Sequence, residues 1–196
     1  AEARGSGRRA RRDRADPGSR QRGPAMRGRA VRVVGPLHWI GYPALAVVAA
    51  TLVFATPVRL FRLPLPEPIF PMVLAFAWPL IRPSMLAPAV LLVVGLFLDL
   101  LWGGPMGLWA LSLLCAYGVI LFARPLIVGQ DVRALLGWYV GATILAYALG
   151  YVFTALDVKA APSLVGAFFQ VLVTVLLFPL ANNLIERFDD GDVRFR

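Results

Sequence analysis

The chain has 196 residues, of which 59% are hydrophobic, and its mean hydropathy is +0.70. Only 16% of the residues are charged, against about 25% in soluble globular domains. The composition therefore excludes an ordinary soluble domain and indicates a polytopic membrane protein. The net charge of +9 comes largely from an arginine-rich N-terminal stretch and does not by itself indicate nucleic-acid binding, and the single cysteine, Cys115, excludes an internal disulfide.

Residues 1–36 are rich in Arg, Gly, Ala and Pro and show no apolar periodicity, so they are predicted to form a disordered cytoplasmic tail. Met26 is a candidate native start, in which case the earlier residues would not belong to the natural protein. The tail is either a solvated flexible segment, which we favour, or a basic arm that contacts anionic lipid. Residues 189–196 are predicted to form a second, short cytoplasmic tail.

Six apolar segments predict an all-α polytopic membrane domain over residues 37–188, with six transmembrane helices. The segments cover residues 37–58, 68–81, 84–102, 105–123, 135–156 and 162–185. The second segment is short, because its residues would rise only about 21 Å as a helix against a hydrocarbon core of roughly 30 Å. We expect the bilayer to thin around it, its flanks to extend it, or the other helices to shield it. Pro105 is expected in the first turn of the fourth helix, and Pro179 is expected to kink the sixth.

The distribution of basic residues predicts the orientation of the domain. With six crossings and the N-terminus inside, 17 of the 20 lysines and arginines lie on the side of the two termini. Positive charge is enriched on the cytoplasmic side of membrane proteins. The chain is therefore predicted to have both termini in the cytoplasm.

Asp99 is the one charge inside an apolar run, and a carboxylate in a membrane helix is costly enough to suggest a role. Gly95, Asp99 and Gly103 are four residues apart and share one face of the third helix, where glycines allow a neighbouring helix to approach closely. Pro105 and Gly107 belong to a tight turn that follows. Asp99 either accepts backbone N–H groups at the start of the fourth helix or a partner's donor, or it is a solvated residue near the headgroups.

The other polar residues offer no catalytic arrangement. His38 is the only histidine, so imidazole pairs cannot bind a metal, and Ser112 and Cys115 have no neighbouring His or Lys to activate them. No HExxH motif, no pair of intramembrane carboxylates and no glycine-rich phosphate loop is present. We therefore predict that the protein is not an enzyme and binds no metal or cofactor. Isolated polar residues such as Thr143 and Thr174 are expected to hydrogen-bond to the carbonyl four residues earlier or to a neighbouring helix.

Tryptophan and tyrosine residues lie mostly towards the ends of the apolar segments, which predicts an aromatic belt at the membrane interfaces. The residues expected at the interface around the third helix are Trp78, Arg82, Pro83 and Trp102. Small residues four apart mark candidate helix contacts. These pairs are Ala46 with Ala50 and Gly137 with Gly141.

The glycines around Asp99 form a pattern that resembles a known family. The stretch Gly95-Leu96-x-x-Asp99-x-x-x-Gly103-x-Pro105-x-Gly107-Leu108, preceded by Trp78-Pro79-Leu80-Ile81-Arg82-Pro83, is similar to rod shape-determining proteins of the MreD family. The resemblance covers about residues 37–188. It implies a non-enzymatic scaffold of the elongasome in the bacterial inner membrane, which takes part in cell-shape maintenance and lateral peptidoglycan synthesis. The implied partners are MreC and, through it, MreB, RodA and the partner transpeptidase of RodA.

The same resemblance implies the six-helix fold of the substrate-binding subunits of energy-coupling-factor transporters, which raises an alternative function. Ala46 and Ala50 resemble the small-residue docking surface of those subunits, so the chain could instead bind a vitamin for such a transporter. A tight ligand site needs several convergent polar groups, and the predicted outer loops offer few. The membrane scaffold is therefore the leading hypothesis.

Overall fold

The computed structural model describes residues 32–34, 37–55, 59–60, 63–64, 67–158, 163–189 and 193–195. Most of the predicted N-terminal tail and parts of the outer loops lie outside these residues. The helices are η1 (Leu37–Gly41), α1 (Tyr42–Ala55), α2 (Pro71–Ile81), α3 (Leu86–Trp102), α4 (Leu108–Ile127), α5 (Val132–Val158), α6 (Leu164–Val175) and α7 (Phe178–Asp189). The strands are β1 (Arg32–Val34), β2 (Arg59–Leu60), β3 (Leu63–Pro64) and β4 (Val193–Phe195).

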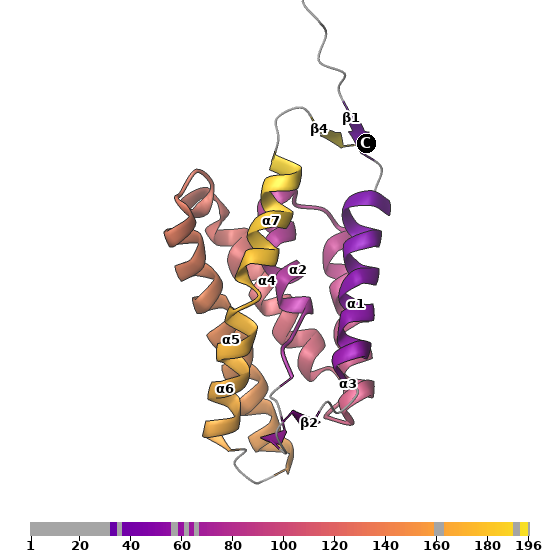
Figure 1. The fold of residues 1–196 in the computed structure, drawn as a ribbon, viewed down its shortest axis with the longest axis vertical. Helices are drawn as coiled ribbons and strands as arrows, with labels where there is room; N and C mark the ends of the chain where they lie inside the picture. The colour runs from indigo at the N-terminus through magenta and orange to yellow at the C-terminus, as the bar shows by residue number, and fades with distance from the viewer. Residues whose placement is uncertain are drawn as a thin grey trace, which may run out of the picture. The chain divides into compact units, whose positions relative to one another are not determined.

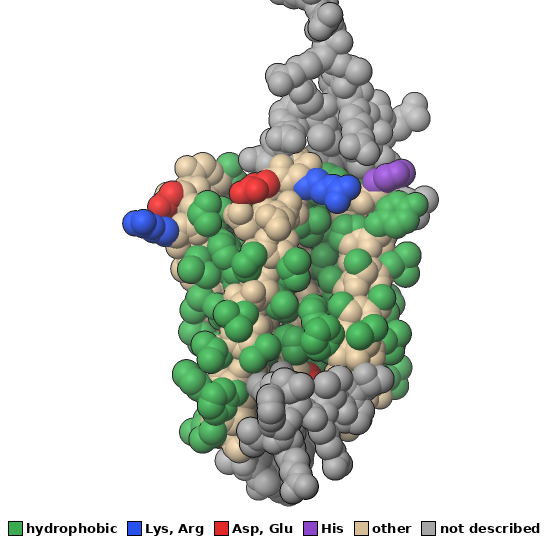
Figure 2. All heavy atoms as spheres, viewed as in Figure 1, with side chains coloured by type: hydrophobic (Ala, Val, Ile, Leu, Met, Phe, Trp, Pro, Cys, Tyr) green, Lys and Arg blue, Asp and Glu red, His purple; other side chains and the backbone are tan. Residues whose placement is uncertain are grey.

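The helices fit an α-helical membrane protein (Figure 1). Four stretches in the described part of the chain are long and apolar enough to cross a membrane, namely His38–Ala55, Leu108–Ile127, Val132–Leu156 and Leu164–Phe188. α2 and α3 are apolar but shorter, with 11 and 17 residues. Hydrophobic side chains cover much of the face in Figure 2, and most of its visible charged side chains gather at the end where α1 begins and α7 ends. A surface of this kind is suited to contact with lipid.

Both ends of the membrane domain lie on the same side of the bundle. β1 pairs in parallel with β4, with Arg32 opposite Val193 and Val34 opposite Phe195. These two short strands fall within the segments predicted as cytoplasmic tails. β2 and β3 form a small antiparallel pair in the connection between α1 and α2. Because β1 precedes the first helix and β4 follows the last, the chain between them returns to the side from which it started.

The short helix α2 lies inside the bundle, which explains how the sequence tolerates it. Every residue from Pro71 to Leu80 is buried, and α2 contacts α1, α3, α4, α5 and α7. Of the three alternatives for the short second segment, the structure therefore has the shielded one. Irregular backbone at membrane depth is tolerated only where protein or water satisfies it, so a helix this short is compatible with the bilayer when other helices surround it.

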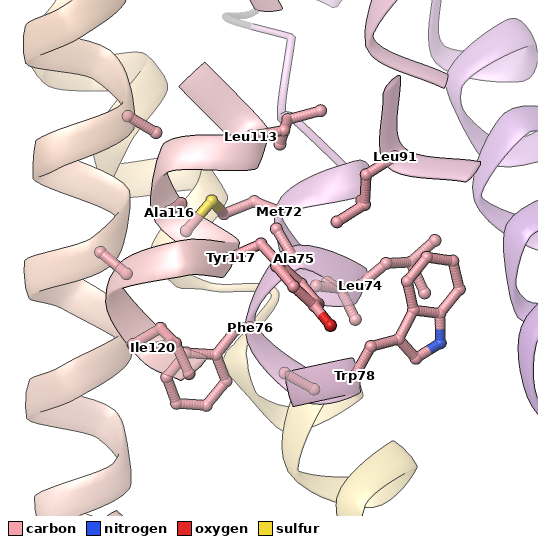
Figure 3. Close-up of a cluster of buried hydrophobic side chains, with 14 of the residues drawn as sticks. Met72, Leu74, Ala75, Phe76, Trp78, Leu91, Leu113, Ala116, Tyr117 and Ile120 are labelled. Carbon is pink, nitrogen blue, oxygen red and sulfur yellow. The ribbon is translucent and has the colours of Figure 1, made fainter. Parts of the chain in front are cut away.

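The core is built around α2. Figure 3 shows Met72, Phe76 and Trp78 of α2 among side chains from α3 and α4. The α4 side chains in this cluster are Leu113, Ala116, Tyr117 and Ile120, and all of them are buried. Phe76 also meets Tyr139 of α5 edge to face, with ring centroids 5.1 Å apart. The core thus combines aliphatic packing with aromatic pairs, which stabilise by about 0.5–1.5 kcal/mol each beyond burial.

The sixth apolar segment is interrupted rather than kinked. α6 ends at Val175, residues 176 and 177 form a turn, and α7 begins at Phe178. The proline ring of Pro179 would clash with the carbonyl four residues earlier, which belongs to Val175, and it cannot donate a hydrogen bond. The predicted site of disturbance is therefore correct. The helix is divided into α6 and α7 here, and the N–H of Leu180 bonds to the carbonyl of Leu177, three residues earlier.

Candidate functional site

Asp99 joins the end of α3 to the start of α4. Its side chain is 1% exposed, and its Oδ2 accepts the N–H of Gly107 at 2.8 Å while its Oδ1 accepts the N–H of Trp109 at 2.9 Å. Gly107 is the N-cap of α4 and has no side chain with which to cap the helix. Asp99 therefore satisfies N–H groups that the first turn of α4 would leave unpaired, and it sits at the positive end of the helix dipole. The structure has the anchoring arrangement and not the solvated one.

Gly95 makes the closest approach between α3 and α4. A Cβ atom built on Gly95 would lie 2.3 Å from the Cα of Ala110 and 2.6 Å from its backbone N, both of which are backbone atoms. Gly95 lies one helical turn before Asp99 on the same face of α3, so the contact and the two hydrogen bonds hold the same pair of helices together. The two small residues, one on each helix, let the backbones come near enough for Asp99 to reach α4.

Gly103 and Gly107 border the turn between α3 and α4. No atom lies within 4 Å of a Cβ built on either residue, so neither permits a close helix approach. Gly103 instead caps the end of α3 with φ of 63°, and Gly107 starts α4 with φ of 92°. Glycine adopts this left-handed region without the steric cost that other residues incur. Within the chain, Gly103 therefore does not make the close helix approach that its spacing predicts, whereas Gly107 lies in the turn region where it is expected. The requirement at both positions is conformational.

Pro105 lies in the turn between the two helices and not in the first turn of α4, which begins at Leu108. Its carbonyl accepts the N–H of Leu108 at 3.2 Å. The expected place in the first turn of the fourth helix is thus wrong, because α4 starts after its N-cap Gly107, which Asp99 holds, whereas the expected place in the tight turn is confirmed.

A second buried polar cluster joins α2, α5 and α6, and the sequence did not single it out. The Thr174 side chain is 0% exposed, and its Oγ1 accepts the N–H of Ile69 at 3.2 Å and lies 2.9 Å from the hydroxyl of Tyr147. The hydroxyl of Tyr139 donates to the Thr174 carbonyl at 3.2 Å. This cluster gives the backbone entering α2 a hydrogen-bond partner inside the bundle. The only signal in the sequence was an isolated threonine, for which a bond to a neighbouring helix was one of two expectations.

Replacing Thr174 with valine should lower the free energy of unfolding by about 2–3 kcal/mol. The change leaves the buried N–H of Ile69 without a partner, which costs about 1–3 kcal/mol, and it removes an interhelical hydroxyl pair, worth about 0.6 kcal/mol in membranes. Unfolding of the purified protein in detergent measures the effect. Thr143→Val is the matched control, because Thr143 is equally buried but bonds only to the carbonyl of Tyr139 in its own helix. Equal losses in the two variants would contradict the role of Thr174.

The four residues predicted at the interface differ in burial and in their hydrogen-bond partners. Trp78 is 0% exposed, and its indole N–H donates to the Trp39 carbonyl at 3.2 Å, so its side chain faces other helices and not the lipid. Trp102 is half-buried and donates to Oε2 of Glu67 at 2.7 Å, which ties the segment before α2 to the end of α3. Arg82 ends α2, where its backbone N–H bonds to the Trp78 carbonyl, and Pro83 is exposed.

The two pairs of small residues that were candidates for helix contacts lie in different surroundings. No atom lies within 4 Å of a Cβ built on Gly137 or Gly141, so this pair does not form a helix contact among the described residues. Ala46 and Ala50 line a cavity of about 490 Å³ between α1, α2 and α7. Each of these helices contributes apolar walls to it.

A second cavity, of about 570 Å³, lies beside the Asp99 junction. Its lining comes from the turn before α4, from α4 and from the end of α5: Pro105, Met106, Gly107, Leu108, Leu111, Phe153 and Leu156. No side chain in this set carries a hydrogen-bonding group. A small polar ligand such as a vitamin requires several convergent polar groups. The cavity is therefore suited to an apolar occupant.

The Asp99 junction is built from one carboxylate, two backbone N–H groups and the close contact of Gly95 with Ala110. No group of three or more His, Cys, Asp or Glu residues comes together in the part of the chain that the structure describes. Comparison of the chain with protein-family models, with curated proteins and with solved structures found no match. The features that bear on function are therefore the helices themselves, the Asp99 junction and the two cavities.

Proposed function

We propose that the protein is a non-enzymatic scaffold of the bacterial elongation complex in the inner membrane, with six crossings and both termini in the cytoplasm. The observation that carries the proposal is the Asp99 junction. The residues on which the resemblance to the MreD family rests include Gly95, Asp99 and Gly107, and these three build one connection between α3 and α4. A motif that shapes a helix pair, without reacting groups, is suited to presenting a surface to a partner.

Two further features support this arrangement. The pairing of β1 with β4 brings both ends of the domain to one side, as an even number of crossings requires. The apolar cavity beside the Asp99 junction lies where α3 ends and α4 begins. The charge distribution assigns this end of the two helices to the outer side of the membrane. We propose that it receives an apolar part of a membrane partner, for which the resemblance suggests MreC. MreB, RodA and its partner transpeptidase would then be reached through that partner.

Depletion of the protein in a rod-shaped host should make the cells round and swollen, as seen by microscopy. Wild-type protein supplied in trans should restore rods, whereas Met106→Glu should not, because it places a charge in the apolar cavity. Met106 is 68% exposed, so this change should leave folding intact. Met85→Glu is the control, since Met85 is 92% exposed and precedes α3 at its other end.

Unchanged cell shape on depletion would contradict the scaffold function. Vitamin binding for an energy-coupling-factor type transporter would then become the leading alternative. Mass spectrometry of the purified protein would test it, because a tightly bound vitamin should remain with the protein. Restoration of rods by Met106→Glu at normal membrane levels would instead contradict only the proposed role of the cavity.

A further inference from the structure

The cavity between α1, α2 and α7 is an apolar groove with a basic rim. His38 of η1 and Arg187 near the end of α7 line it, and the pairing of β1 with β4 puts these two helix ends on the same side. Away from this rim the lining is apolar or aromatic, and none of the described lining residues is acidic. Arg187 is exposed and has no carboxylate partner within the described part of the chain. The rim therefore offers an exposed guanidinium and an imidazole above an apolar groove.

The length of the groove matches one leaflet of a bilayer. Along η1 and α1 it reaches from His38 to Ala50, a rise of at most about 18 Å, whereas half of the hydrocarbon core is about 15 Å. Ala50 is the last lining residue on α1, and one turn beyond it the ring of Phe54 contacts that of Phe70, with centroids 5.1 Å apart. A partner helix that crosses the membrane would need a groove through both leaflets. The groove instead suits a chain that enters from one side and stops near the middle.

We propose that this groove binds an anionic phospholipid, with an acyl chain along Ala46 and Ala50 and the phosphate beside Arg187 and His38. The guanidinium supplies charged hydrogen-bond donors to phosphate oxygens, and the imidazole adds a further donor. Basic pockets between transmembrane helices commonly bind anionic lipid headgroups. The volume of about 490 Å³ lies in the range of about 300–1,000 Å³ that is usual for ligand sites. This lipid site does not depend on the proposed scaffold function.

Native mass spectrometry of the full chain tests the proposal. The protein is equilibrated with equal amounts of phosphatidylglycerol and phosphatidylcholine that carry identical acyl chains, and the lipid retained after release from detergent is identified. Wild-type protein should retain phosphatidylglycerol preferentially. Arg187→Gln should reduce that preference about fivefold, the factor expected for one arginine near an anionic surface. Ala46→Trp should abolish retention of both lipids, because the indole fills the groove.

Matched variants keep the test specific. Arg133→Gln removes an exposed arginine outside the groove, and Ala49→Trp enlarges an exposed alanine of α1 that does not line it. Both should retain phosphatidylglycerol as the wild type does. Equal retention of the two lipids, or equal effects of Arg133→Gln and Arg187→Gln, would overturn the proposal. A polypeptide that co-purifies with the wild type and is lost in Ala46→Trp would assign the groove to a partner helix and would also overturn it.

Discussion

Gly95→Ala is expected to destabilise the protein by about 3 kcal/mol, the upper end of the usual cost of overpacking a core. The added methyl group would lie 2.3 Å from the Cα of Ala110, and a backbone atom cannot rotate away as a side chain can. α3 and α4 would have to separate, which also lengthens the hydrogen bonds of Asp99 to α4. The free energy of unfolding in detergent should fall, and thermal unfolding should occur at a lower temperature.

Gly118→Ala is the control for this prediction. Gly118 lies within α4, and no atom lies within 4 Å of a Cβ built there. Its replacement should leave stability unchanged or raise it slightly, because alanine favours the helix over glycine. If Gly95→Ala were as stable as Gly118→Ala, the contact between Gly95 and Ala110 would not hold the two helices together.

Asp99→Ala is expected to cost about 3–5 kcal/mol of unfolding free energy. It removes the acceptor of two buried backbone N–H groups, those of Gly107 and Trp109, and a hydrogen bond to a charged group contributes about 1.5–3 kcal/mol. Asp99→Asn should fall between wild type and Asp99→Ala, because the amide keeps one acceptor oxygen. The same unfolding measurement in detergent compares the three proteins.

Asp131→Ala separates this effect from the ordinary loss of a helix cap. Asp131 is exposed, and its Oδ1 accepts the N–H of Ala134 in the first turn of α5 at 3.2 Å. Its loss should cost about 1 kcal/mol, the usual value for a cap. A comparable loss at the two positions would mean that burial of Asp99 adds nothing. Reduced complex formation in Asp99→Ala must be judged against its folded fraction, because this change is expected to weaken the fold itself.

The Asp99 junction shows how far local sequence information reaches. Asp99, Gly103 and Gly107 lie within nine consecutive residues, so a helix end, a tight turn and the next helix start bring them together whatever the rest of the bundle does. The carboxyl group could therefore be predicted as an acceptor for the start of the fourth helix. The conformational role of Gly103 could not be predicted, because its four-residue spacing from Asp99 does not separate a turn glycine from a contact glycine.

The sequence by itself determined the membrane class, the six apolar segments and the disturbance at Pro179, because these follow from hydropathy and backbone chemistry within short stretches of chain. Only the tertiary structure decided that α2 and Trp78 lie at the centre of the bundle and that Thr174 serves the backbone before α2. It also decided that Gly95 rather than Gly137 contacts another helix. The physical reason is that lipid and protein interior are almost equally apolar. Hydropathy therefore marks a helix as membrane-embedded, but the packing of helices distant in sequence decides which of its faces meets protein and which meets lipid.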